Sequence, residues 1–264
     1  MISTTLRLPE RTAKPRRSGL TMVIDTGIPL AAFTDMIEFS ADYIDYVKFG
    51  WGTAVVTSSL RQKIDVLSAH DVRFYFGGTL FEKYVLQDRF DDFRRLCLDY
   101  GASHVEVSNG TIAMSNHEKA SYIRKLAGDF EIVSEVGFKD QQRSELLPPS
   151  AWIEYINEDL EAGAGLVTLE ARESGKSGIC RPDGELRFGL IEDVLRAGIG
   201  KERLLFEAPS TELQAHFITR IGSDVNLGNI PASAVISVET LRLGLRGDTL
   251  ATFEDKDNPH AYHS

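Results

Sequence analysis

Charged side chains recur in this sequence at the points where apolar segments end. The segment Tyr43–Phe49 has the β-branched and aromatic composition of a buried strand, and it carries Lys48 just before Gly50, where the chain can turn sharply. Ionisable groups inside apolar strands are costly to bury unless they are paired or bound to a metal. The pattern therefore predicts a pocket in which amines and carboxylates meet. The polar residues near such ends are Asp25, Lys48, Glu106, Ser108, Asn109, Glu135, Glu170, Arg172, Glu173, Glu207, Asn226 and Asn229.

A ring of carboxylates around one pocket would repel itself unless a divalent cation or lysines lay among the acids. The sequence has no cluster of histidines or cysteines, so its candidate ligands are oxygens, which favour Mg2+ over zinc. For any single glutamate an alternative remains open. Side chains alternate along a strand, so a given carboxylate can instead face outward and pair with a residue on a helix.

Lys48 is flanked by Val47 and Phe49, a setting that does not suit a solvated lysine. In an acidic pocket a buried lysine can anchor a phosphate or carboxylate, act as an acid or base, or form a Schiff base with a carbonyl substrate. These three roles stay open on sequence grounds.

The segment Arg172-Glu-Ser-Gly-Lys-Ser-Gly178 offers two cations, two hydroxyl groups and flexible backbone amides. Such a loop is suited to hold a phosphate, with Arg172, Ser174, Gly175 and Lys176 as the candidate contacts. It resembles a Walker A loop only superficially, because the leading glycine and its spacing are absent.

Eight strand-like segments alternate with amphipathic segments, and their starts are separated by roughly 20 to 37 residues, the size of a strand plus a crossover helix. This repetition predicts a single-domain (β/α)8 (TIM) barrel, in which the active site lies at the C-terminal ends of the strands. A doubly wound open sheet is the alternative, but it would ordinarily show a glycine-rich fingerprint after the first strand. The predicted strands are Leu20–Asp25, Tyr43–Phe49, Val72–Gly78, His104–Gly110, Phe130–Gly137, Gly165–Glu170, Leu204–Pro209 and Asp224–Ile230. The predicted helices are Pro29–Ser40, Ser58–Ala69, Arg89–Tyr100, His117–Ala127, Ala151–Ala162, Leu190–Ala197, Glu212–Ile221 and Val235–Gly244.

The chain has 264 residues, a net charge of -10 and 42% hydrophobic residues, which fits one large α/β domain. We expect an N-terminal arm at residues 1–18, the barrel at 19–250 and a polar tail at 251–264. The acidic balance argues against a general nucleic-acid binder. Two cysteines, no signal-peptide pattern and no long apolar run predict a soluble, cytoplasmic protein that does not bind a membrane.

Twelve stretches, spread over about residues 14 to 250, together resemble one known family. They are Lys14-Pro-Arg16, Gly19-Leu-Thr21, Asp42-Tyr-Ile-Asp45, Val47-Lys-Phe-Gly-Trp-Gly-Thr53, Gly77-Gly-Thr-Leu-Phe-Glu82, Val105-Glu106, Glu135-Val-Gly137, Glu170-Ala-Arg-Glu-Ser-Gly-Lys176, Phe206-Glu-Ala-Pro209, Val225-Asn-Leu227, Glu239-Thr-Leu-Arg242 and Gly244-Leu-Arg-Gly-Asp-Thr249. The family that they resemble is that of the phosphosulfolactate synthases.

The resemblance implies a lyase that adds sulfite to phosphoenolpyruvate in a Mg2+-dependent reaction and gives (2R)-phospho-3-sulfolactate. In methanogens this reaction opens coenzyme M biosynthesis, and some bacteria use it to make sulfolactate. Two alternatives remain: an enzyme of the same fold acting on another phosphorylated enol or keto acid, including a Schiff-base aldolase, and a non-catalytic, stress-associated member of the family. A homo-oligomer is expected.

The resemblance also suggests roles for individual residues. Lys139 matches a family lysine and is the expected proton donor, with Lys48 and Glu106 as further catalytic residues. By strand position, the expected metal ligands are Glu106, Glu135 and Glu170. The expected substrate-binding residues are Lys14, Arg16, Arg172, Ser174, Gly175, Lys176 and Asn226.

Overall fold

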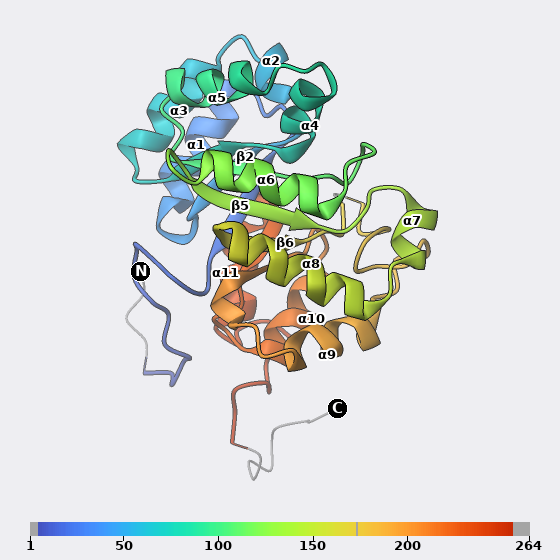
Figure 1. The fold of residues 1–264 in the computed structure, drawn as a ribbon. Helices are drawn as coiled ribbons and strands as arrows, with labels where there is room; N and C mark the ends of the chain where they lie inside the picture. Colours follow the sequence, from blue (N-terminus) through green and yellow to red (C-terminus); the bar gives the residue numbers. More distant parts are fainter. Residues whose placement is uncertain (1–4, 173, 256–264) are drawn as a thin grey trace.

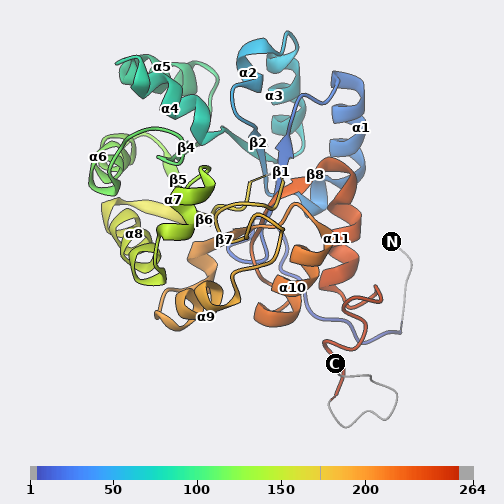
Figure 2. The same cartoon turned by 90° about the vertical axis from the view of Figure 1, so that its right-hand side faces the viewer.

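Eight parallel strands form a barrel that a ring of helices surrounds, as seen in the computed structural model, which describes residues 5–172 and 174–255 (Figures 1 and 2). The strands are β1 (Thr21–Asp25), β2 (Tyr46–Phe49), β3 (Arg73–Phe76), β4 (His104–Val107), β5 (Glu131–Val136), β6 (Ala164–Leu169), β7 (Leu204–Glu207) and β8 (Leu227–Pro231). The helices are α1 (Leu30–Ser40), α2 (Thr53–Val56), α3 (Leu60–Ala69), α4 (Gly78–Leu86), α5 (Phe90–Asp99), α6 (Asn116–Leu126), α7 (Gln141–Leu146), α8 (Pro149–Ala162), α9 (Phe188–Arg196), α10 (Thr211–Ile221) and α11 (Val235–Arg242). The predicted TIM barrel is therefore confirmed.

The barrel has one seam, between β3 and β4. The strand order is β3-β2-β1-β8-β7-β6-β5-β4, and no hydrogen-bonded ladder joins the two end strands within the described chain. Side chains bridge the seam instead. Glu106 on β4 accepts a hydrogen bond from the backbone N–H of Gly78, and Glu82 on α4 accepts one from the Ser108 hydroxyl. A Cβ at position 78 would overlap Ser108, so the close approach of α4 to β4 requires glycine there.

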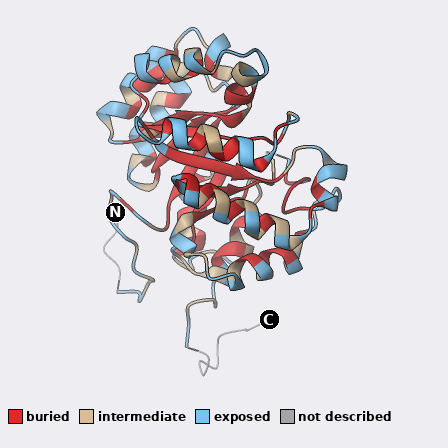
Figure 3. Ribbon diagram, in the orientation of Figure 1, coloured by how far each residue is buried: buried red, intermediate tan, exposed pale blue. Residues whose placement is uncertain are grey.

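The strands are buried almost throughout, whereas buried and exposed residues alternate along the helices (Figure 3). Buried apolar side chains form two clusters, one inside the barrel and one between the strands and the helices. Met22, Tyr75 and Leu205 belong to the inner cluster, which separates the two ends of the barrel. The cluster between the strands and the helices is the larger one and includes Phe33, a fully buried residue of α1. Among the described residues, no helix has the length and apolar character to span a membrane.

Three helices were not predicted, namely α2, α4 and α7. The pair Gly77-Gly78 was interpreted only as the end of the third strand, yet Gly78 also begins α4. The helix α7 lies in a polar stretch with little apolar periodicity. Its N-cap is Asp140, whose side chain accepts a hydrogen bond from the N–H of Arg143. Local propensity is a weak guide to such short helices, which depend on tertiary packing.

Behind the strand ends, two buried ion pairs link the helices to the sheet. Lys63 of α3 lies 2.5 Å from Asp25 at the end of β1. Lys119 of α6 lies 2.7 Å from Asp159 of α8 and also donates to the backbone carbonyl of Glu135, 2.8 Å away. These pairs fix the ends of β1 and β5 relative to the helices outside them.

We expect Asp159→Ala to lower the free energy of unfolding by about 3–5 kcal/mol, because it leaves the Lys119 ammonium buried without its carboxylate. Urea denaturation measures this change. The control is Glu192→Ala, which removes the partner of Arg220 and Arg196 in solvent-exposed ion pairs and should lower the free energy of unfolding far less. Similar losses in the two variants would contradict a stabilising role for the buried pair.

Candidate active site

The C-terminal ends of five strands place one lysine and four glutamates around a single small cavity. Lys48 comes from β2, Glu106 from β4, Glu135 from β5 and Glu207 from β7, while Glu170 directly follows β6. All five side chains are buried. They face inward because side chains alternate along each strand, and the intervening residues pack against the helices.

Lys48 lies at the centre of this cluster. Its Nζ atom is 2.9 Å from Oε1 of Glu106, 3.4 Å from Oε1 of Glu207 and 3.6 Å from Oε2 of Glu135. Burial alone would lower the pKa of Lys48, but the three carboxylates outweigh burial and raise that pKa well above its ordinary value. The side chain is therefore an ammonium group at neutral pH.

Lys139 supplies a second amine from the loop that follows β5. Its Nζ atom lies 3.4 Å from Oε1 of Glu135 and 3.7 Å from Oε2 of Glu170, and it donates a hydrogen bond of 3.0 Å to the Thr79 hydroxyl. Burial acts to lower the pKa of Lys139, and the two carboxylates overcome it, so the pKa is raised. Lys139 is more exposed than Lys48 and lies at the outer side of the cluster.

The pKa values of Glu106, Glu135 and Glu170 are shifted in different directions. Burial raises the pKa of Glu106 to about 7, although Lys48 opposes the shift. Burial and the neighbouring charges of Glu135 and Glu207 raise the pKa of Glu170. For Glu135, burial is outweighed by Lys139 and Lys48, and the pKa is lowered. Two amines and the guanidinium of Arg172 do not neutralise four ionised carboxylates, so the cluster retains protons or takes up a cation.

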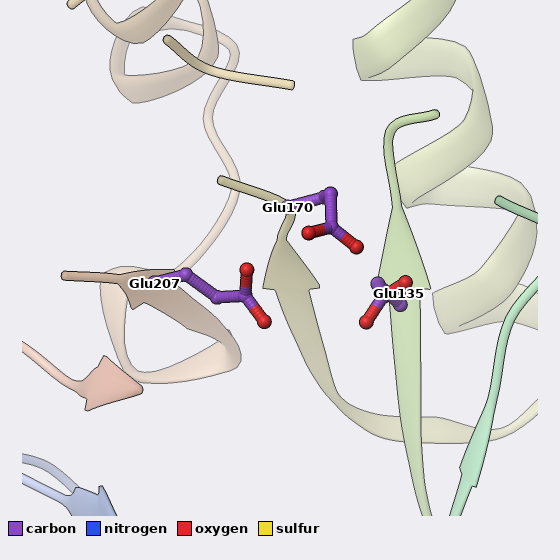
Figure 4. Close-up of side chains that lie close together, drawn as sticks. All are labelled: Glu135, Glu170 and Glu207. Carbon is purple, nitrogen blue, oxygen red and sulfur yellow. The ribbon is translucent and has the colours of Figure 1, made fainter. Parts of the chain in front are cut away.

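Glu135, Glu170 and Glu207 are the described residues that come together as a candidate metal site (Figure 4). Each offers an oxygen, and these oxygens lie within 4.8 Å of one another. Both carboxylate oxygens of Glu135 and Oε2 of Glu170 are buried without a hydrogen-bond partner in the described structure. An oxygen-only set of this kind suits Mg2+.

This ligand set differs from the predicted one at one position. Glu106 was expected to be a ligand, but it is not among the three glutamates whose oxygens lie within 4.8 Å of one another. Its Oε1 contacts Lys48 and its Oε2 accepts the N–H of Gly78, much as Glu207 contacts Lys48 and accepts the N–H of Ala171. Glu207 takes its place in the cluster. The sequence marked Glu207 as a residue at a strand end, but only the arrangement of strands around the barrel shows which glutamates are neighbours.

Three residues around the cavity have a left-handed backbone conformation, which is uncommon for residues other than glycine. They are Trp51 (φ 51°), Arg172 (φ 60°) and Asn229 (φ 52°). Asn229 lies at an irregularity where Thr21 and Val23 of β1 face Leu227 and Ile230 of β8. Bulges of this kind redirect side chains beside active sites.

The sequence prediction named Asn226, and not Asn229, as a substrate-binding residue. Asn226 lies at the N-terminal end of the barrel, opposite the carboxylate cavity. The Asn226 amide accepts from the N–H of Leu20 and donates to the carbonyls of Glu202 and Leu204, so it joins the starts of strands. Its predicted role in substrate binding at the carboxylate cavity is therefore wrong. Asn229 instead lines that cavity, and its Oδ1 atom has no hydrogen-bond partner among the described residues.

Lys14 and Arg16 are also remote from the carboxylates. Lys14 donates to the carbonyl of Ala41, and Arg16 lies 3.3 Å from Asp45, which directly precedes β2. Both residues thus lie at the N-terminal end of the barrel. The prediction that they contribute positive charge to the active-site cavity is wrong.

The loop after β6 contributes Arg172 to the cavity. Ser174 and Lys176 are exposed and do not line it, and Gly175 is buried beside Leu213 and Pro209. The structure therefore brings together Lys48, Lys139, Arg172 and the glutamates, but not the remainder of the predicted phosphate cradle. Residue 173 lies outside the described part.

The raised pKa of Glu106 leads to a pH prediction for the metal-free protein. Between about pH 4.5 and pH 7 the folded protein holds a proton on Glu106 that the unfolded chain has lost, so stability falls as pH rises through this range. Glu106→Gln mimics the protonated form and should show a smaller fall. Urea unfolding of both proteins with chelator, at about pH 5 and pH 7, measures the difference. Equal slopes would contradict the assignment.

Comparison with known proteins identifies the family of the chain. A sequence model of the (2R)-phospho-3-sulfolactate synthase family, ComA, matches residues 9–248. The phosphosulfolactate synthase of Bacillus subtilis (strain 168) is 51% identical over 244 residues, which cover 92% of this chain and 97% of the relative. That of Methanothermobacter thermautotrophicus is 41% identical over 249 residues, which cover 92% and 95%.

Solved structures support the fold independently. The structure of 3-hexulose-6-phosphate synthase from Salmonella typhimurium matches with a TM-score of 0.57 and covers 86% of this chain and 100% of that chain. At 13% sequence identity this likeness shows the fold alone. The sequence matches carry the functional assignment: this protein is an enzyme that belongs to the (2R)-phospho-3-sulfolactate synthase family.

Proposed function

We propose that this enzyme adds sulfite to phosphoenolpyruvate in a Mg2+-dependent reaction and forms (2R)-phospho-3-sulfolactate. Family membership supports the product class. The observation that carries the proposal is the position of Lys139, a charged amine beside two carboxylates of the candidate metal site. Addition to an enol phosphate needs both a proton donor and stabilisation of negative charge, and this cavity offers groups for each.

The reaction balances without a redox partner. The sulfur lone pair of sulfite forms a bond to C3, and the electron pair of the C2–C3 double bond moves toward C2 and the carboxylate. A proton then bonds to C2, so the sulfonate is on C3 and the phosphate stays on the oxygen of C2. The protein must hold two anions together and deliver one proton to a defined face.

The residues around the cavity suit these tasks. Lys139, which donates a hydrogen bond to Thr79 at the cavity, would give its proton to C2. Lys48 is fixed by carboxylates on three strands and supplies a permanent positive charge. Arg172 lies at the same cavity and offers a guanidinium group for phosphate or sulfite.

Glu135, Glu170 and Glu207 would hold the Mg2+ ion. When bound there, the ion would stabilise the negative charge that develops on the substrate carboxylate. The observation that fits such an ion is that three buried oxygens of Glu135 and Glu170 accept no hydrogen bond in the described structure and contact lysine ammonium groups, at 3.4 to 3.7 Å.

We expect Lys139→Met to lower kcat by about 10²- to 10⁴-fold, because it removes the proton donor. Production of the sulfonated acid from phosphoenolpyruvate and sulfite is the measurement. Lys83→Met, which removes an exposed lysine of α4, is the control and should leave kcat unchanged. A folded Lys139→Met enzyme with near-normal kcat would refute the donor role.

A second prediction separates the two possible ligand sets. Chelation of divalent metal should stop turnover and added Mg2+ should restore it, and Glu207→Gln should weaken the apparent Mg2+ affinity by at least about tenfold. Glu106→Gln should change the apparent Mg2+ affinity less, because Glu106 is not one of the three glutamates whose oxygens lie within 4.8 Å of one another. Weakened affinity in Glu106→Gln alone would favour the ligand set expected from the sequence, and full activity in chelator would exclude the metal.

A further inference from the structure

A second cavity, of about 420 Å³, lies at the N-terminal mouth of the barrel, opposite the carboxylate site. Four arginines line it, namely Arg16, Arg17, Arg73 and Arg203. They come from the segment before β1, from the start of β3 and from the turn before β7. The inner apolar cluster of the barrel lies between this mouth and the carboxylates, so the two sites do not share a cavity.

Three of these arginines have no carboxylate partner within residues 5–172 and 174–255. Arg73 donates to the Tyr46 hydroxyl, 3.0 Å away. Arg203 donates to the backbone carbonyls of Gly165 and Ala164, at 2.9 and 2.6 Å. Arg17 is exposed and makes no hydrogen bond or ion pair with the described residues. Arg16 alone is paired, with Asp45.

The acids at this mouth do not cancel the positive charge. Glu131 and Glu202 line the cavity, but both are exposed, and neither comes within ion-pair distance of an arginine in the described structure. Burial, and next to it the positive charge of Arg73, lower the pKa of the buried His104 ring to about 4. This pKa therefore responds to changes of charge at the mouth. This positive mouth belongs to a chain whose net charge is -10.

We propose that the N-terminal mouth is a second ligand site, which binds a small acid through its phosphate or sulfonate group. Guanidinium groups recognise tetrahedral oxyanions through paired N–H donors, and the arginines that line this cavity have N–H donors beyond those used in the contacts above. The volume lies within the range of small-molecule sites. The ligand shares its chemistry with the compounds of the proposed reaction and with free phosphate, so the source must be tested.

The test uses inorganic phosphate as the probe and the imidazole NMR signals of His104 as the readout. Bound phosphate should raise the pKa of His104 in a saturable way, because it offsets the field of Arg73. Arg73→Gln and Arg17→Gln should each weaken phosphate binding by about tenfold. Arg17 is exposed and makes no hydrogen bond or ion pair with the described residues, so Arg17→Gln should not affect folding. If Arg73→Gln fails to fold, phosphate binding by Arg17→Gln tests the proposal.

Arg61→Gln is the matched control. The Arg73 guanidinium lies over the Tyr46 ring, 5.2 Å from its centroid. The Arg61 guanidinium on α3 likewise lies over the Tyr100 ring and donates to the backbone carbonyl of Asp99, but Arg61 does not line this cavity. Its loss should leave phosphate binding unchanged. No saturable response of His104, or a response that both Arg73→Gln and Arg17→Gln leave intact, would overturn the proposal.

The same titration with phosphoenolpyruvate identifies the source. Tighter binding of phosphoenolpyruvate than of phosphate would indicate that the N-terminal mouth is a site for a compound of the proposed reaction. Equal binding would indicate a site for phosphate itself. The readout needs no turnover, so it is independent of the activity proposed above.

Discussion

The structure depends on one contact: a lysine ammonium buried among carboxylates from three different strands. Lys48 reaches from β2 to Glu106, Glu135 and Glu207 and so connects strands across the interior of the barrel. Each of these charges would be costly to bury alone, and removal of one partner leaves the others uncompensated. The cluster therefore constrains both the shape of the barrel mouth and the charge that a substrate meets there.

The surrounding backbone is adapted to this cluster. Trp51, Arg172 and Asn229 hold left-handed conformations at the rim, and the irregular pairing of β1 with β8 turns Asn229 inward. Such conformations cost free energy and persist where the surrounding structure enforces them. Lys119, by holding the carbonyl of Glu135, extends the support outward into the helix layer.

The sequence predicted the fold well, because each strand is a short apolar run that ends in a glycine or a charge, and this pattern repeats eight times. The cluster was predicted only in outline. Which glutamates become neighbours depends on strand order and stagger around the barrel, so Glu207 could not be ranked above Glu106. Asn229 was missed because a bulge breaks the strict alternation that sequence reasoning assumes. The error for Lys14 and Arg16 had a different cause. They precede the first strand, so the chain direction itself places them at the N-terminal end, and the family resemblance alone did not locate them in the barrel.

The seam between β3 and β4 has a topological consequence. Followed around the barrel from β4, the strands run in order to β8 and then through β1 to β3, so the seam is the single junction that no ladder spans in the described structure. A circular permutant that began just before β4 and ended after α5 would keep every ladder intact. The hydrogen bonds from Gly78 to Glu106 and from Ser108 to Glu82 would then join the first and last modules of the rearranged chain. Glu106 thus joins β4 to α4 across the seam and also pairs with Lys48.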